Sequence, residues 1–273
     1  MRRAEPGDLL AFVHIQKTAG TSMKFILKNS FGVKHCDIRP VDPSRNKPVD
    51  SDDLAFARRI YEDLRSIGGH EIIEPTAHLP AEVRPYTMLR DPVSRAVSHF
   101  QDQNVRGHEP PSFDAYMADS GNHDFQVRKI AGTADLDKAR ELLEAAYFFV
   151  GLTERFDESM RLLAQLSPYP LDLRYVRRNV ARDNRFRDAV LGDPNKVARI
   201  QEANQRDQAL FEWVRDIHLP GQLEATDPAP STAPLPVIPD RLIKPPRYAA
   251  SRAVHKLRYL PALKRERRRR GFL

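Results

Sequence analysis

The feature that most constrains the fold is an apolar segment that leads directly into a polar loop and then into a helical repeat. Residues 12–27 read "FVHIQKTAGTSMKFIL". The apolar run at 9–15 predicts a short buried strand, and the spacing of apolar residues over 21–30 predicts a helix. A strand, a short loop and a helix form the unit from which parallel sheets are built.

The composition places the chain among soluble globular proteins. Its 273 residues are 41% hydrophobic and 30% charged, and no stretch approaches the roughly 20 apolar residues that a membrane span needs. Glu5, Pro6 and Asp8 lie where a secretory signal would be apolar, and Cys36 is the only cysteine. We therefore expect a cytoplasmic protein. We also expect no metal ion, because the 9 histidines show no metal-ligand spacing.

The positive charge is concentrated towards the C-terminus. Residues 241–273 hold 12 of the 44 Lys and Arg residues but 1 of the 37 Asp and Glu residues, which leaves 32 basic and 36 acidic residues in 1–240. A slightly acidic body does not favour a nucleic-acid-binding domain. The proline-dense segment predicts a domain at 1–219, a Pro-rich linker at 220–247 and a basic tail at 248–273.

The basic tail has three interpretations. Its apolar residues at helical spacing among Lys and Arg could dock on an anionic membrane surface, such as the inner face of the cell membrane. The tail could also guide a polyanionic acceptor, or stay a disordered, solubilising segment. A specific nucleic acid is not expected as a partner, and the oligomeric state is left open.

The alternation of strands and helices predicts an α/β, P-loop-like three-layer fold with a central, mainly parallel sheet. Residues 36–51 predict a loop, and a helix is expected from its N-cap Asp52 to Ile67, ended by Gly68 and Gly69. The other predicted strands are 86–89, 148–152 and 171–176. The other predicted helices begin after Asp91 and span 135–147, 153–166 and 194–217.

The first junction between strand and helix has groups that suit an anion. Lys17 supplies a positive charge and Thr18, Thr21 and Ser22 supply hydroxyl donors, while N–H groups of the loop and the helix N-terminus favour a negative group. The loop is not a Walker loop, in which a glycine comes first and the lysine follows the last glycine. Here Lys17 precedes Gly20. Ligands of parallel sheets bind at this edge, where the strands end.

The second junction, "LRDPVSRAVS" (89–98), has a similar character. Arg90 lies where the strand ends, and Ser94 and Ser98 share one face of the following helix. The guanidinium fork of arginine matches the oxygens of a phosphate group. Two anion-binding junctions imply a ligand with two separated phosphate-like groups.

Together these two motifs resemble those of carbohydrate sulfotransferases that use 3′-phosphoadenosine-5′-phosphosulfate (PAPS). "HIQKTAGTS" (14–22) and "LRDPVSRAVS" are most like the loops of heparan sulfate 6-O-sulfotransferases. "FQVRKIAG" (125–132) and "FVGLTERFDESMRLL" (149–163) resemble later segments of that family in the same order. The resemblance covers residues 9–217 and indicates a soluble, bacterial-type relative.

The resemblance implies an enzyme that moves a sulfuryl group from PAPS to a hydroxyl of a carbohydrate or glycoconjugate by in-line displacement. Arg90 and Ser98 would bind the 3′-phosphate, and Lys17 would also stabilise charge on the departing oxygen. The residues implied for the 5′-phosphosulfate are Lys17, Thr18, Ala19, Gly20, Thr21 and Ser22. PAPS would be a co-substrate, and the reaction would need no metal.

The resemblance also implies a histidine base between the two motifs. His70, in "SIGGHEIIEP", is preferred over His78, because a histidine after two glycines matches the family pattern. His14 is expected to be a packed residue, and residues 177–179 (Arg177, Arg178 and Asn179) could contact the adenosine side of the donor. Two alternatives are left open: a P-loop phosphotransferase, and a non-catalytic nucleotide-binding module with a basic interaction tail.

Overall fold

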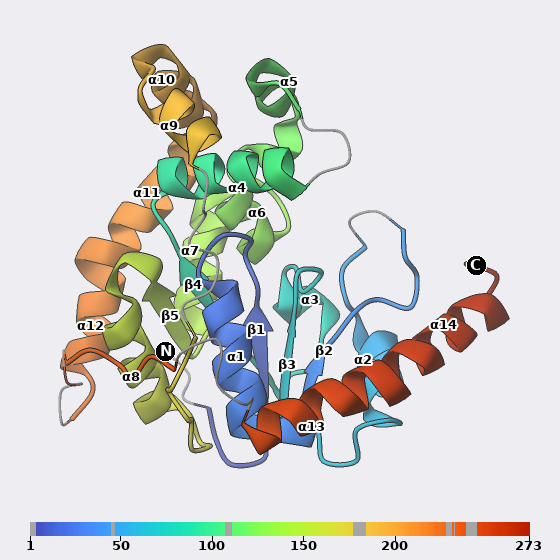
Figure 1. Ribbon diagram of the computed structural model, residues 1–273. Coiled ribbons are helices and arrows are strands. Elements are labelled where there is room, and N and C mark those ends of the chain that lie inside the picture. The colour runs from blue at the N-terminus through green and yellow to red at the C-terminus, as the bar shows by residue number, and fades with distance from the viewer. Residues whose placement is uncertain are drawn as a thin grey trace.

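The structure is a computed structural model that describes most of the chain. The described residues are 4–44, 47–106, 111–176, 184–227, 231, 233–238 and 245–273. The predicted α/β class is confirmed, because a parallel sheet with helices on its faces forms the centre of the molecule (Figure 1).

Within these residues, five strands form one sheet in which every neighbouring pair is parallel. Their order across the sheet is β2 (His35–Asp37), β3 (Ser66–Gly69), β1 (Leu9–Val13), β4 (Val83–Leu89) and β5 (Phe149–Leu152). Strand β1 is central and buried along its whole length, as its apolar sequence predicts. Because all strands run the same way, their carboxyl ends meet at one edge.

The helices cover the two faces of this sheet. The connection from β1 to β2 and the connection from β4 to β5 cross the sheet in opposite directions, so right-handed crossovers place their helices on opposite faces. None of the helices in the described segments is long and apolar enough to cross a membrane. The helices up to β5 and just after it are α1 (Gly20–Phe31), α2 (Ser51–Arg58), α3 (Pro75–His78), α4 (Pro92–Arg106), α5 (Phe113–Ala118), α6 (Phe125–Ala131), α7 (Leu136–Ala145) and α8 (Phe156–Leu166).

The predicted helix that ends at Gly68 and Gly69 is wrong. Helix α2 begins at Ser51, where Asp50 and Asp53 form a capping box, and it ends at Arg58. The two glycines belong to β3, which pairs with both β1 and β2. A Cβ at Gly69 would lie 2.7 Å from the carbonyl oxygen of Ile38, so glycine allows the close approach of neighbouring backbone.

Three other predicted elements differ from the structure. Residues 36–51, expected to be a loop, include β2. Residues 171–176 form no strand and contribute one isolated bridge, between Tyr175 and Val237. The helix expected at 194–217 is interrupted at Asn204, which leaves helical geometry while its side chain accepts the N–H of Asp124 at 3.2 Å. The helical elements between residues 185 and 224 are α9 (Arg185–Leu191), α10 (Pro194–Ala203), α11 (Gln205–Trp213), a π-helical turn (Val214–His218) and α12 (Leu219–Glu224).

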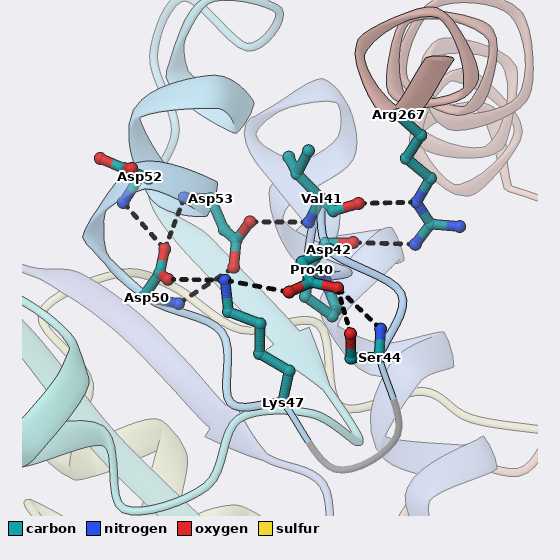
Figure 2. Close-up of polar contacts among 9 residues, drawn as sticks. All are labelled: Pro40, Val41, Asp42, Ser44, Lys47, Asp50, Asp52, Asp53 and Arg267. Atoms are coloured by element: carbon teal, nitrogen blue, oxygen red, sulfur yellow. Dashed lines mark hydrogen bonds and ion pairs between the residues drawn. The ribbon is translucent and has the colours of Figure 1, made fainter. Parts of the chain in front are cut away.

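The C-terminal helical segment runs across α1 towards α2 (Figure 1). It consists of α13 (Pro246–Val254), a π-helical turn (His255–Tyr259) and α14 (Leu260–Arg269). The buried Tyr259 hydroxyl donates to the carbonyl of Arg39 at 3.1 Å and accepts its N–H at 3.0 Å. Arg267 donates to the carbonyls of Pro40 and Val41 at 2.8 and 3.1 Å (Figure 2). The basic segment is therefore fixed to the loop that follows β2.

Candidate functional site

A cavity of about 540 Å³ lies at the carboxyl edge of the sheet. It is lined by the loop between β1 and α1, by residues that follow β3, β4 and β5, and by α4. The predicted site residues that line it are Lys17, Ala19, Gly20, Thr21, Ser22, His70, Arg90 and Ser98. The remaining predicted residue, Thr18, is buried and braces the loop, because its hydroxyl donates to the carbonyl of Ile15 at 2.9 Å.

The loop between β1 and α1 has a curled backbone. Lys17 and Ala19 have φ angles of 71° and 61°, in the left-handed region that costs free energy for residues other than glycine. Helix α1 begins at Gly20, and no side chain of the described residues caps this end. The first-turn N–H groups of a 12-residue helix and the positive end of its dipole thus face the cavity region, as an anion site requires.

Lys17 pairs with an acidic residue that the sequence analysis did not single out. Its Nζ lies 3.3 Å from Oδ1 of Asp102, which is on α4 and also lines the cavity. Asp102 follows Ser98 by four residues, so both lie on one face of α4. This spacing could have indicated that Asp102 lies in the cavity, but an acidic residue is not expected in an anion site.

Arg90 joins the two predicted anion-binding junctions. One of its terminal nitrogens donates to the carbonyl of Lys17 at 3.1 Å. Its backbone N–H and C=O exchange hydrogen bonds of 2.9 and 2.8 Å with the side chain of the buried Gln126, on α6. Burial lowers the pKa of Arg90, although such a group stays charged at neutral pH. The guanidinium is therefore a fixed cation between the two loops.

Helix α4 brings Ser98 into the cavity but leaves Ser94 outside its lining. The helix begins at Pro92, and Asp91 accepts the N–H of Ser94 at 2.7 Å, as its predicted role as N-cap requires. Ser94 thus belongs to the first turn of the helix, and Ser98, one turn further on, reaches the cavity.

His70 is a neutral imidazole at the carboxyl end of β3. Its Nδ1 lies 3.2 Å from the carbonyl oxygen of His14, which can only accept, so Nδ1 carries the proton and Nε2 is left as an acceptor. Burial and then the charge of Lys24 lower the pKa of His70 to about 4. At neutral pH His70 is therefore uncharged, with Nε2 available as a hydrogen-bond acceptor.

His14 packs against His70 with ring centroids 3.9 Å apart. It is buried, its Nδ1 has no hydrogen-bond partner among the described residues, and burial lowers its pKa well below the usual value. A Cβ at Gly20 would lie 1.6 Å from its Nε2. The glycine of the loop is thus required by the close packing of His14.

The other candidate base, His78, lies at the end of α3 and does not line the cavity. Its carbonyl accepts a hydrogen bond from Ser51 at 3.3 Å. Arg177, Arg178 and Asn179 lie outside the described residues. Of the two histidines considered, the cavity therefore contains His70.

Lys129, on α6, contacts the backbone of His70. Its ammonium donates to the carbonyl of His70 and lies 5.4 Å from the ring centroid of Phe125. Burial lowers the pKa of Lys129 to about 8. Phe125 and Lys129 lie in the segment "FQVRKIAG" (125–132). In the sequence, the resemblance of this segment to the sulfotransferase family was the only indication that it contributes to the site.

Comparisons with known proteins do not assign this site. No protein-family model matches the chain, and no curated protein matches it.

Proposed function

We propose that the protein is a PAPS-dependent O-sulfotransferase that acts on a hydroxyl of a carbohydrate or glycoconjugate. The observation that carries this proposal is the hydrogen bond from Arg90 to the carbonyl of Lys17, which joins the two anion-binding loops within one cavity. Together with the two motifs, this arrangement suits a donor that has two separate phosphate-like groups. His70 in the same cavity supplies a neutral base.

In this proposal the loop at 17–22 and the N-terminus of α1 bind the 5′-phosphosulfate, and Arg90 and Ser98 bind the 3′-phosphate. Lys17 leaves Asp102 and turns to the oxygen that bridges phosphorus and sulfur. Charge stabilisation and positioning are the main demands of such a transfer, as they are for phosphoryl groups.

The chemical step is a single displacement at sulfur. The acceptor oxygen attacks the sulfur atom while the bond between sulfur and the bridging oxygen breaks, and the bridging oxygen leaves with its electron pair on adenosine 3′,5′-bisphosphate. Nε2 of His70 takes the proton of the acceptor hydroxyl, and Lys17 stabilises the negative charge on the leaving oxygen. The products are a sulfate ester and the bisphosphate.

The test is a calorimetric titration with adenosine 3′,5′-bisphosphate, compared with ADP and 5′-AMP. We expect tight binding that needs the 3′-phosphate and weakens at least tenfold in Arg90→Ala, because a charged hydrogen bond is lost. Equal binding of ADP, with turnover of Mg-ATP, would identify a phosphotransferase instead. Bisphosphate binding without conversion of PAPS on a panel of sugar acceptors would indicate a non-catalytic binding module.

A further inference from the structure

A second cavity shares His70 with the first. It has a volume of about 350 Å³, and His70 lines both cavities. Its walls come from the ends of β2 and β3, from α1 and from the C-terminal helical segment. The residues proposed to bind the donor, Lys17, Arg90 and Ser98, do not line it, so a ligand in this cavity would contact His70 without occupying the donor-binding residues.

The charges of this cavity favour a negative group. Lys24, on α1, lines it and makes no hydrogen bond or ion pair within the part of the chain that the structure describes. A partly buried ammonium without a partner is unfavourable, and burial lowers the pKa of Lys24 accordingly. Arg39 and Arg267 add two cations to the lining.

The acidic groups of the cavity do not cancel this charge. The carboxylate of Asp37 already has partners, because it lies 2.5 Å from Nζ of Lys28 and 3.4 Å from Nε2 of His35. Glu71 is the other acidic residue of the lining. Among the described residues, the lining therefore has three cations and one carboxylate, Glu71, for which no ion pair is seen. Such a carboxylate is suited to accept hydrogen bonds from sugar hydroxyls.

The C-terminal helical segment contributes two polar side chains that can make further hydrogen bonds. Arg267 donates through Nε and one terminal nitrogen to the backbone at 40–41 (Figure 2), and its other terminal nitrogen has no hydrogen-bond partner among the described residues. His255 stacks on Tyr259 at 5.1 Å, and its buried Nδ1 has no partner among the described residues either. Both residues line the cavity.

We propose that this second cavity is an acceptor subsite that binds an anionic substituent of the sugar, with Lys24 as its main cation and the C-terminal helical segment as one wall. The proposal rests on the proposed function, because the acceptor hydroxyl must reach His70 while the donor occupies the first cavity. The basic segment is then part of the acceptor site, joined to the body by Tyr259 and Arg267.

The experiment compares sugar binding by the full chain saturated with adenosine 3′,5′-bisphosphate. The probes are trigalacturonate, which carries carboxylates, glucose 6-phosphate, which carries a phosphate, and neutral maltotriose. We expect one or both anionic probes to bind at least tenfold more tightly than maltotriose, and the stronger of the two identifies the substituent. Equal binding of all three probes, or binding of none, overturns the proposal.

Variants locate the subsite. Lys24→Gln should remove the preference for the anionic probe, Lys24→Arg should keep it, and Lys264→Gln, which removes the same charge from an exposed position, should leave it unchanged. Arg267→Ala should weaken the anionic probe severalfold, and the exposed Arg265→Ala should not. A preference that persists in Lys24→Gln contradicts the proposal.

The titrations are repeated without bisphosphate, so that a failure of donor binding, which would refute the proposed function, is distinguished from a failure of this subsite.

Discussion

At the scale of single residues, the cavity combines fixed cations with a histidine that is uncharged at neutral pH. Lys17 and Arg90 supply positive side chains to the cavity, while Nδ1 of His70 is bound to the carbonyl of His14, which leaves Nε2 as an acceptor. A protonated His70 would add another cation but could not act as a base. In the proposed reaction, anion binding and proton transfer therefore belong to different residues.

This separation predicts the titration of His70. Its pKa of about 4 means that almost all His70 is neutral at pH 6 and above, so the protonated fraction should rise only as the pH falls towards 4. An NMR titration of the imidazole signals, with His70→Gln to assign them, measures the midpoint. Lys24→Gln should raise this midpoint, because the nearby charge that opposes protonation is removed. A midpoint near 6.5 in the unaltered protein contradicts the prediction.

A second prediction concerns Asp102, whose carboxylate lies 3.3 Å from Nζ of Lys17. A bound phosphosulfate must displace this carboxylate and tolerate its negative charge. We expect Asp102→Asn to tighten the binding of adenosine 3′,5′-bisphosphate about fivefold, since one partly exposed ion pair corresponds to about 1 kcal/mol. Asp114→Asn is the control, because Asp114 pairs with Arg199 at the surface and does not line the cavity. Weaker binding in Asp102→Asn would show that the carboxylate positions Lys17 instead.

At the scale of elements, the turn from β1 into α1 depends on a missing side chain. Gly20 is the first residue of α1, and His14 occupies the space where a Cβ would lie. Helix α1 can then start directly beside the pair of stacked histidines. An alanine at this position must move either the helix or His14.

We therefore predict that Gly20→Ala destabilises the protein by about 1–3 kcal/mol, the usual range for forced overpacking. Gly221→Ala is a matched control in α12, where a Cβ would meet nothing within 4 Å and alanine favours the helix by about 0.5–1 kcal/mol. Chemical denaturation of both variants measures the difference. Equal stability of Gly20→Ala and the unaltered protein would mean that His14 moves freely.

The sequence predicted elements well where local pattern decides them. The loop after β1 and the junction at Arg90 were found because apolar run, polar loop and helix follow one another within a few residues. Strand β3 was missed because its two glycines have the local pattern of a helix end, whereas pairing with β1 and β2 decides the structure. Asp102 and the walls contributed by the C-terminal segment depend on tertiary packing, which local spacing does not contain.

At the scale of the whole molecule, burial keeps several histidines neutral. Burial lowers the pKa of His218 and of His255 to about 4, below the value of about 6.5 expected in an unfolded chain. Between these values the unfolded chain binds protons that the folded protein does not bind. The free energy of unfolding should therefore fall as the pH decreases from about 6.5 to 4.

We predict that His218→Gln reduces this loss of stability at low pH. A difference of about two pKa units corresponds to about 3 kcal/mol, which partial solvent exposure reduces to about 1–2 kcal/mol for this residue. The measurement is urea unfolding at pH 7.5 and pH 5 for His218→Gln and for His78→Gln, which lies outside this buried set. The same pH dependence in the unaltered protein and in both variants would exclude a contribution from His218.

The contact between Tyr259 and Arg39 joins residues that are 220 positions apart in the chain. A ribosome adds about 5–20 residues per second, so the loop after β2 is made roughly 10–40 s before Tyr259. During that interval the wall formed by the C-terminal segment is missing, although β1, α1 and β4 can already have assembled. The first cavity needs residues from 14 to 153, whereas the last wall of the second cavity is made near residue 267. The order of synthesis therefore allows the first cavity to form before the second.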